Sequence, residues 1–178
     1  MWRVMARDGP SRATVRAIAR EAGYTTGMIS HYFRDKRELI EYGSTLLLDR
    51  SLARITAEAR DDPVAALAEL LPLDDRRRDQ ARLWLTMMGW SGTDPVLAGQ
   101  LARAHQQVRR HLRLVVGRQF PAIAEDEDDI RDVTDQVLAV IDGLTIGGLT
   151  NPDDYPPDRQ LAVLRATLTT LSNHLAHP

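Results

Sequence analysis

The sequence of 178 residues predicts an all-α protein, in which a short N-terminal module of three helices precedes a larger helical domain. Apolar residues recur at helical spacing along nearly the whole chain, and no stretch sustains the period-two alternation of a strand. Proline follows an acidic residue at Asp62-Pro63 and Asp94-Pro95, a pattern typical of helix starts. We therefore expect about nine helices and no sheet, in two domains at residues 1–42 and 43–178.

Start and stop signals place the individual helices along the chain. Gly9-Pro10 stops the first helix, because proline cannot continue one. Residues suited to N-capping precede the next three helices: Thr14, Thr25, and a capping box formed by Asp35 and Glu38. The helices are expected at residues 2–8, 15–22, 26–33, 36–60, 63–72, 76–90, 95–118, 128–149 and 158–176.

The composition favours a cytoplasmic globular protein. The chain has no cysteine, so it has neither a disulfide framework nor a thiolate metal site. The N-terminus lacks the apolar core of a signal peptide, and no uncharged apolar run approaches the roughly 20 residues of a membrane helix. The charge is uneven: residues 1–45 carry eight basic and five acidic residues, whereas the chain as a whole has a net charge of −2. A basic N-terminal part points weakly to an anionic partner.

Two short helices joined by a glycine-containing turn are the signature of a helix-turn-helix. Gly23 stands where the helix 15–22 must stop, at a position that often needs a positive φ. Ile29 and Phe33 fall on one face of the helix 26–33. The opposite face carries small or polar groups of the kind that contact bases, and hydroxyls and an ammonium stand at the helix ends. A plain helical hairpin with turn glycines and a solvated basic face is the alternative.

The string "TVRAIAREAGYTTGMISHYFRDKRELI" at residues 14–40 resembles the DNA-binding signature of the TetR family of bacterial repressors. The segment "IDGLTIGGLTNPDDYPPDRQLAVL" at residues 141–164 resembles the BetI-type branch of that family more loosely. The first helix of family members is longer than the stretch before Gly9-Pro10, so contacts of its N-terminal part are left unassigned. The candidate base-reading residues are Arg16, Thr26, Gly27, Met28, Ser30 and His31. The candidate phosphate-binding residues are Thr14, Thr25, Tyr32 and Lys36.

The resemblance implies that the larger domain binds a ligand and dimerises. Apolar stripes at helical spacing on the last two helices are candidates for a four-helix dimer interface. Their members are Val137, Ile141, Leu144, Leu164, Leu168 and Leu171. The segment "LWLTMMGW" concentrates large, adaptable side chains suited to an organic ligand. The candidate pocket residues are Trp84, Met87, Met88 and His105. For both sets, the protein's own core is the alternative.

Other polar clusters are expected to have no catalytic or metal-binding role. The acidic run "EDEDD" at residues 125–129 lacks the spacing of a calcium loop and suits the start of a helix. His105 and His111 are six residues apart, which places them on different sides of a helix. We expect no metal, no cofactor and no enzymatic activity.

The sequence thus predicts a homodimeric transcriptional regulator, expected to be a repressor. Its partners would be double-stranded operator DNA with an inverted repeat and a small-molecule effector that releases the protein from DNA. The alternative is a helical protein-interaction protein that has lost DNA binding. An all-helical enzyme is the remaining possibility.

Overall fold

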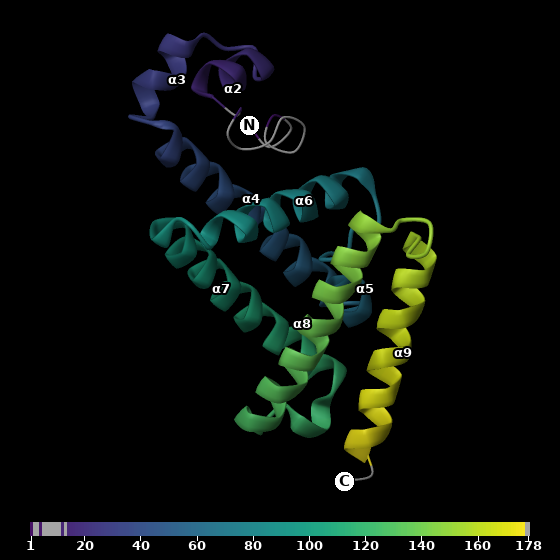
Figure 1. Cartoon of the computed structure of the whole chain (residues 1–178). Coiled ribbons are helices and arrows are strands. Elements are labelled where there is room, and N and C mark those ends of the chain that lie inside the picture. The colour runs from purple at the N-terminus through teal and green to yellow at the C-terminus, as the bar shows by residue number, and fades with distance from the viewer. Residues whose placement is uncertain (2–3, 5–11, 13, 177–178) are drawn as a thin grey trace. The chain divides into compact units, whose positions relative to one another are not determined.

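The computed structural model describes residues 1, 4, 12 and 14–176 (Figure 1). Apart from Val4, the helix predicted at residues 2–8 lies outside this part of the chain. The described residues form α-helices and one short 3-10 helix, and they contain no strand, which confirms the predicted fold class. The helices are α2 (Val15–Glu21), α3 (Thr26–Tyr32), α4 (Lys36–Glu58), α5 (Pro63–Ala68), α6 (Asp75–Ser91), α7 (Pro95–Gln119), η1 (Pro121–Ile123), α8 (Glu127–Thr150) and α9 (Pro157–Ala176).

The predicted caps are present in the structure. The Thr14 hydroxyl accepts a hydrogen bond from the Ala17 N–H at 3.1 Å, and the Thr25 hydroxyl accepts one from the Met28 N–H at 3.3 Å. Asp62 caps α5 in the same way, directly before Pro63. These short side chains satisfy N–H groups that a helix start leaves without partners, so local sequence is enough to fix these boundaries.

The helix predicted at residues 63–72 is shorter than expected, since α5 ends at Ala68. Beyond it the chain turns more tightly: the Leu70 N–H bonds to the Leu67 carbonyl and the Leu71 N–H to the Ala68 carbonyl. Pro72 disfavours the helical conformation of the residue before it and offers no N–H of its own. The proline therefore ends the helical segment early.

The chain forms two compact units, residues 1–50 with 82–104 and residues 51–81 with 105–178. Helices α4, α6 and α7 each contribute residues to both. The sequence boundary between residues 42 and 43 does not coincide with this division, and it remains a prediction.

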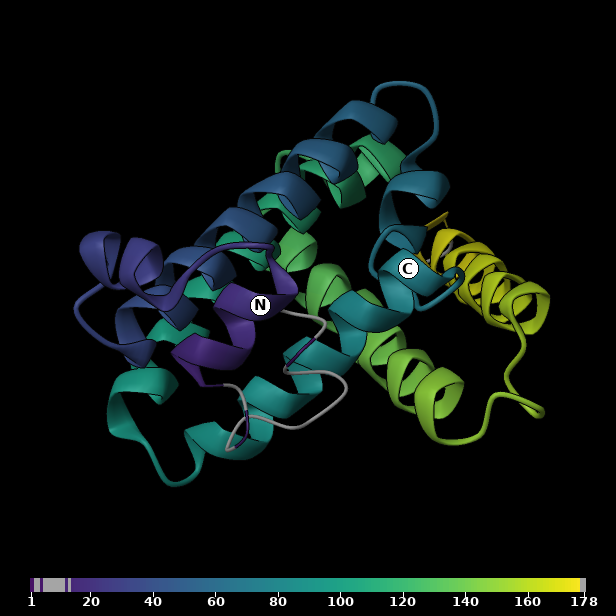
Figure 2. The ribbon, with the colours of Figure 1, turned by 90° about the horizontal axis from the view of Figure 1, so that it is seen from above.

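The first unit is built around the helix-turn-helix pair α2 and α3, which pack against each other (Figures 1 and 2). Its core joins α2 and the start of α4 to the second half of α6 and the start of α7. Ile29 and Phe33 pack against this core, as their spacing predicted. The buried members are Val4, Ile18, Leu39, Leu83, Met87, Leu97 and Leu101.

The second unit contains α8 and α9, which run antiparallel and side by side (Figure 1). Helix α5 packs against α9, and η1 packs against α8. The fully buried side chains of this unit include Ile55, Leu67, Leu71, Leu112, Val115, Val116, Val137, Ile141, Leu164 and Gln160. No helix among the described residues is long and apolar enough to cross a membrane.

Candidate nucleic-acid interface

Helix α2 buries one face and presents the other. Ile18 and Ala19 are only 3% and 1% exposed, and their burial anchors the helix in the core of the first unit. Ala22 is exposed because it is the C-cap residue and the helix has already ended. Arg16 is exposed, so its guanidinium is accessible to an anionic partner.

The turn between α2 and α3 is a Schellman motif. The Tyr24 N–H donates to the Ala19 carbonyl at 2.9 Å, and the Gly23 N–H donates to the Arg20 carbonyl at 3.2 Å. Gly23 has a φ of +74°, and it is the one positive-φ residue among those described. This is the left-handed conformation that glycine adopts without a steric penalty, so the role predicted for Gly23 is confirmed.

Helix α3 presents all five of its predicted base-reading positions to solvent. Ile29 is half-buried and fixes the orientation of the helix, while the opposite side remains open. A Cβ atom added to Gly27 would meet nothing within 4 Å in this chain, and the Met28 side chain keeps 50% of its exposure. The five exposed positions are Thr26, Gly27, Met28, Ser30 and His31.

The predicted phosphate-binding groups lie at the ends of these helices. Thr14 and Thr25 use hydroxyl lone pairs as N-caps, which leaves each O–H free to donate to another oxygen. The Tyr32 side chain is 72% exposed, and its ring meets His31 edge-on with centroids 5.2 Å apart. Lys36 is half-buried at the start of α4, and burial lowers the pKa of its ammonium.

The connection from α3 to α4 is held by a variant of the predicted capping box. The Glu38 N–H donates to the Asp35 carboxylate at 2.9 Å, as expected. The Glu38 carboxylate accepts from the Arg34 N–H at 2.8 Å, one residue earlier than in the standard box. This backbone hydrogen bond, supported by the Arg34 guanidinium, lowers the pKa of Glu38. The two acids thereby fix the first turn of α4 next to Lys36.

Sequence reasoning missed one exposed aromatic in this region. Tyr24 lies in the turn between Gly23 and Thr25 and keeps 56% of its exposure. It lies next to Thr25, a predicted phosphate ligand, and its hydroxyl is a group of the kind that donates hydrogen bonds to phosphates. The sequence carried no clear signal for this exposure, because the residue after a left-handed glycine often packs back onto the helix.

Comparison with protein-family models agrees with this geometry, in the N-terminal part of the chain and in the larger part that follows it. Residues 2–42 match the family model of bacterial regulatory proteins of the tetR family. Residues 59–173 match the model of the C-terminal domain of BetI-type transcriptional repressors. The chain belongs to the TetR family, and its larger part is of the BetI type. It is therefore a helix-turn-helix transcriptional regulator and not an enzyme.

Individual relatives agree with this TetR-family assignment. The HTH-type transcriptional regulator BetI of Pseudomonas aeruginosa PAO1 is 30% identical over 164 residues, covering 87% of this chain and 80% of the relative. BetI of Vibrio campbellii is 25% identical over 169 residues, covering 90% and 82%. A transcriptional regulator from Rhodococcus sp. Rha1 superposes with a TM-score of 0.79 at 28% identity, covering 95% and 90%. A regulator from Saccharomonospora viridis, solved in complex with choline, shares the fold with a TM-score of 0.78 at 21% identity, covering 94% and 91%.

The four residues predicted to line a ligand pocket lie in different settings. Met87 is 6% exposed within the core of the first unit, where Trp84 packs against the same cluster. Met87 and Trp84 therefore have the contacts of core residues, which was the alternative to a ligand pocket. Met88 is 44% exposed, and His105 belongs to the second unit. In that unit, burial raises the pKa of the Asp142 carboxyl on α8. The electrostatic effect of His105 on α7 opposes this shift.

The apolar stripes predicted for a dimer interface pack largely within the chain itself. Five of the six side chains are buried in the single chain, and Leu171 is half-buried. Their apolar surface is already used between α8, α9 and their neighbours, so the alternative of the protein's own core applies to these five. For Leu171, a place in the dimer interface remains a prediction. The five buried residues are Val137, Ile141, Leu144, Leu164 and Leu168.

The acidic run at residues 125–129 lies at the start of α8. Asp126 is the N-cap of α8 and accepts from the Asp128 and Asp129 N–H groups at 2.9 Å. Asp128 pairs with Arg131 one turn later. Both contacts are what helix-start acids provide, because carboxylates there satisfy open N–H groups and favour the helix dipole.

Proposed function

We propose that this regulator represses transcription as a homodimer whose two α3 helices enter successive major grooves of an inverted-repeat operator, and that it acts in the cytoplasm. One observation carries the proposal: α3 turns Ile29 inward and leaves open a face of small and polar residues together with the Met28 thioether. Half-sites about one helical turn apart, 34–36 Å, would fit a twofold pair of such helices.

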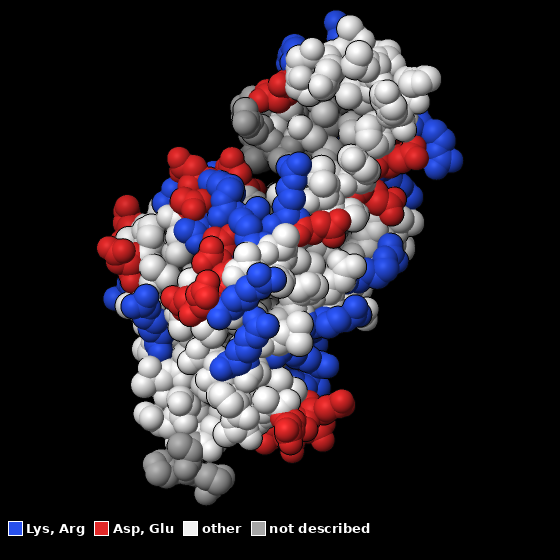
Figure 3. All heavy atoms as spheres, turned by 180° about the vertical axis from the view of Figure 1, so that it is seen from behind, with Lys and Arg blue, Asp and Glu red and all other residues white. Residues whose placement is uncertain are grey.

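The exposed positions divide by chemistry into two roles. The α3 face from Thr26 to His31 offers a hydroxyl, a ring nitrogen and a thioether for base edges. Thr14, Thr25, Tyr32 and Lys36 offer hydroxyls and an ammonium to phosphates. A phosphate oxygen beside Lys36 would favour the charged form that burial disfavours. Basic and acidic side chains are interspersed over the face drawn in Figure 3, so that face does not offer DNA a continuous basic surface.

The two roles predict different responses to substitution. Lys36→Ala is expected to weaken binding to all DNA sequences alike, and to reduce the slope of log affinity against log salt by about 1. His31→Ala or Thr26→Ala should change which bases are preferred, by about 1–3 kcal/mol at the contacted position. Competition binding against single-base variants of the operator measures both. An equal loss of preference in both kinds of variant would contradict the division.

A stripe on α8 supports a dimer contact on a face other than the one predicted. After Asp132, the exposed positions of this helix contain no charged residue, and Ile146 keeps 48% of its exposure. Depletion of charged residues is typical of the centre of an interface. The stripe consists of Gln136, Ala139, Gly143, Ile146 and Thr150.

The choline complex of the Saccharomonospora viridis regulator makes a small organic cation the first effector to test. Asp142 is a half-buried carboxylate in the second unit, and a bound cation would stabilise its charged form. Calorimetric titration with choline and with its uncharged carbon isostere should show heat for choline alone, and weaker binding to Asp142→Asn. Equal binding of both compounds would show that the protein does not recognise the positive charge of the ligand.

Genomic-fragment selection tests the proposed function most directly. Purified protein is incubated with sheared DNA from its source organism, and the bound fragments are sequenced. A shared inverted repeat upstream of a gene would support the proposal and identify the operator. If a dimeric preparation recovers nothing above background, the proposal of operator binding is wrong. The alternative of a helical protein-interaction protein then takes its place.

A further inference from the structure

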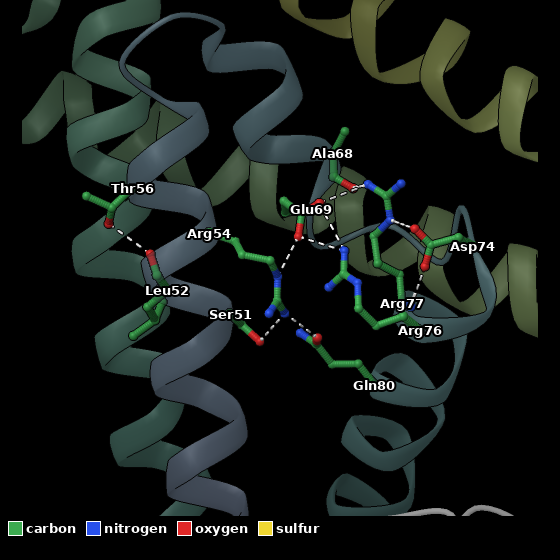
Figure 4. A network of polar contacts seen from close by, with 10 residues as sticks. All are labelled: Ser51, Leu52, Arg54, Thr56, Ala68, Glu69, Asp74, Arg76, Arg77 and Gln80. Atoms are coloured by element: carbon green, nitrogen blue, oxygen red, sulfur yellow. Dashed lines mark hydrogen bonds and ion pairs between the residues drawn. The ribbon is translucent and has the colours of Figure 1, made fainter.

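Three arginines converge on one carboxylate in the second unit (Figure 4). Glu69 directly follows α5, and its side chain is only 13% exposed. Its Oε2 accepts from Arg54 Nε of α4 at 2.9 Å and from Arg76 Nη2 of α6 at 3.0 Å. Its Oε1 accepts from Arg77 Nη1 of α6 at 3.2 Å. These four residues form an arginine cluster that ties the end of α5 to α4 and α6.

Arg77 also holds the turn between α5 and α6, residues 69–74. Its Nη1 donates to the Ala68 carbonyl at 3.3 Å, just before the turn, and its Nε donates to the Asp74 carboxylate at 2.9 Å. The Arg77 backbone N–H donates to the same carboxylate at 2.8 Å. Burial alone would raise the pKa of Asp74, but the Arg77 N–H and the charges of Arg77 and Arg76 outweigh it, so the pKa is lowered. One side chain thus holds both ends of the turn.

The other side of this turn lies against α8. Thr145 is 6% exposed, and its hydroxyl donates to the Leu70 carbonyl at 3.4 Å. A Cβ atom on Gly148 would come within 3.0 Å of Pro72 Cγ, so the proline ring lies close to the helix backbone. Leu71, between the two contact points, is completely buried. The turn is therefore a spacer between the arginine cluster and α8.

The contacted positions of α8 lie nearly opposite its open stripe. A helix turns by about 100° per residue, so Thr145 and Gly148 lie about 60° apart on one side of α8. By the same rotation, Gly143, Ile146 and Thr150 lie within about 60° of one another on the other side. Ile146 is the one large apolar member of the stripe, and it is 48% exposed. A support that fixes the inner side of α8 at this level therefore fixes where Ile146 is presented.

We infer that Arg77 is a positioning residue for dimerisation. By holding the turn 69–74 in one conformation, it places Leu70 and Pro72 against α8 and so sets the position of the open stripe that the partner chain contacts. All these residues belong to the second unit. The inference rests on the proposed function, because it takes the stripe on α8 as the dimer contact.

The test compares full-length Arg77→Met with Arg78→Met. Each variant removes one guanidinium from the first turn of α6, but Arg78 pairs with Asp75, which lies outside the turn 69–74 and is 99% exposed. In Arg77→Met, Glu69 keeps its other two arginine partners. Sedimentation equilibrium over a concentration series measures the dimer dissociation constant. Wild type and Arg78→Met should share one constant, whereas Arg77→Met should dimerise about tenfold more weakly.

A merely structural role for Arg77 would give a different result. Lower stability reduces the folded fraction, but it leaves the dissociation constant of the folded chains unchanged. A folded Arg77→Met variant with the wild-type constant would therefore overturn the inference. If Arg77→Met does not fold, Arg77→Lys replaces it, since a single ammonium keeps the charge but cannot bond to both ends of the turn as the guanidinium does.

A second variant tests the route from the turn to α8. Thr145→Val removes the hydroxyl that bonds to the Leu70 carbonyl and keeps a branched side chain of similar shape. If Arg77 acts through this contact, Arg77→Met should weaken dimerisation less in the Thr145→Val background than in wild type. Independent, additive effects of the two substitutions would show that Arg77 does not act through the turn, and would overturn the inference.

The wild-type protein separates failure of the proposed function from failure of this inference. If wild type stays monomeric at every concentration, the proposed dimer is wrong, and the inference is wrong with it. If wild type dimerises and Arg77→Met matches it, the inference alone is wrong. Hydrogen exchange adds a local measure: the amides of Leu70, Leu71 and Leu73 should exchange faster in Arg77→Met than in Arg78→Met. Equal exchange would overturn the hold of Arg77 on the turn whatever the oligomeric state.

Discussion

Two glycines near the recognition helix are required for different physical reasons. Gly23 has a φ of +74°, a conformation in which any other L-residue is strained. Gly27 has ordinary helical geometry, and a Cβ there would meet nothing within 4 Å. The fold itself requires glycine at position 23, whereas at position 27 the proposed approach of DNA is what requires it.

The two positions therefore predict opposite effects on stability. Gly23→Ala should lower the free energy of unfolding by about 1–2 kcal/mol, the cost of a left-handed non-glycine residue. Gly27→Ala should raise it by less than about 1 kcal/mol through better helix propensity, while weakening operator binding about tenfold. Urea unfolding and operator titration of both variants measure these changes. Gly27→Ala with full affinity would show that DNA does not approach that Cα closely.

Asp142 predicts a pH-dependent contribution to stability. Burial raises the pKa of its carboxyl in the folded state, so the charged form costs stability as pH rises through the folded pKa. Asp142→Asn should therefore be more stable than wild type near pH 8, and the gain should shrink as pH falls toward about 4. Urea unfolding across that range measures the difference. A gain that grows toward acid pH would contradict the assigned cause.

At the scale of elements, two glycines set the packing at the junction of α8 and α9. A Cβ on Gly147 would come within 3.0 Å of the Tyr155 ring. A Cβ on Gly148 would overlap the buried Gln160 amide and come within 3.0 Å of Pro72 Cγ. The Gln160 amide also donates to the Tyr155 carbonyl at 2.8 Å. The absence of side chains at these glycines is what lets the α8–α9 turn close on itself.

Gly148→Ala is expected to lower the free energy of unfolding by about 1–3 kcal/mol, because the Gln160 amide and Pro72 would have to shift. Gly89→Ala on α6 is the control within another helix, since a Cβ there meets nothing within 4 Å. Calorimetry at a fixed protein concentration compares the two. Equal destabilisation by both would mean that overlap with Gln160 and Pro72 is not the cause.

At the scale of the whole molecule, assembly depends on surface that one chain leaves open. Ile146→Glu on α8 should dissociate the dimer and abolish operator binding, because a charge would enter the proposed interface. Leu114→Glu on α7, at 66% exposed, makes the same change elsewhere on the second unit and should leave both properties intact. Sedimentation velocity and operator titration test the pair. Monomeric Leu114→Glu beside dimeric Ile146→Glu would place the interface on α7 instead.

The sequence was most informative where a residue acts on its immediate neighbours. Thr14 and Thr25 cap helices within three residues of themselves, and Gly23 takes the conformation that its own backbone requires. It was least informative about what an apolar stripe packs against. The spacing of Leu164 and Leu168 defines one face of α9, but a face suited to a partner chain has the same spacing as one suited to the core.

The sequence by itself thus determined the helices, the caps, the helix-turn-helix and the family, because these depend on local spacing and on short motifs. Only the tertiary structure decided that Met87 and Leu164 lie in the core, and that an uncharged stripe through Ile146 remains open. It also brought Arg54, Glu69 and Arg76 together across three helices. Contacts of that kind join residues far apart along the chain, and helical periodicity cannot reveal which faces the fold will pair.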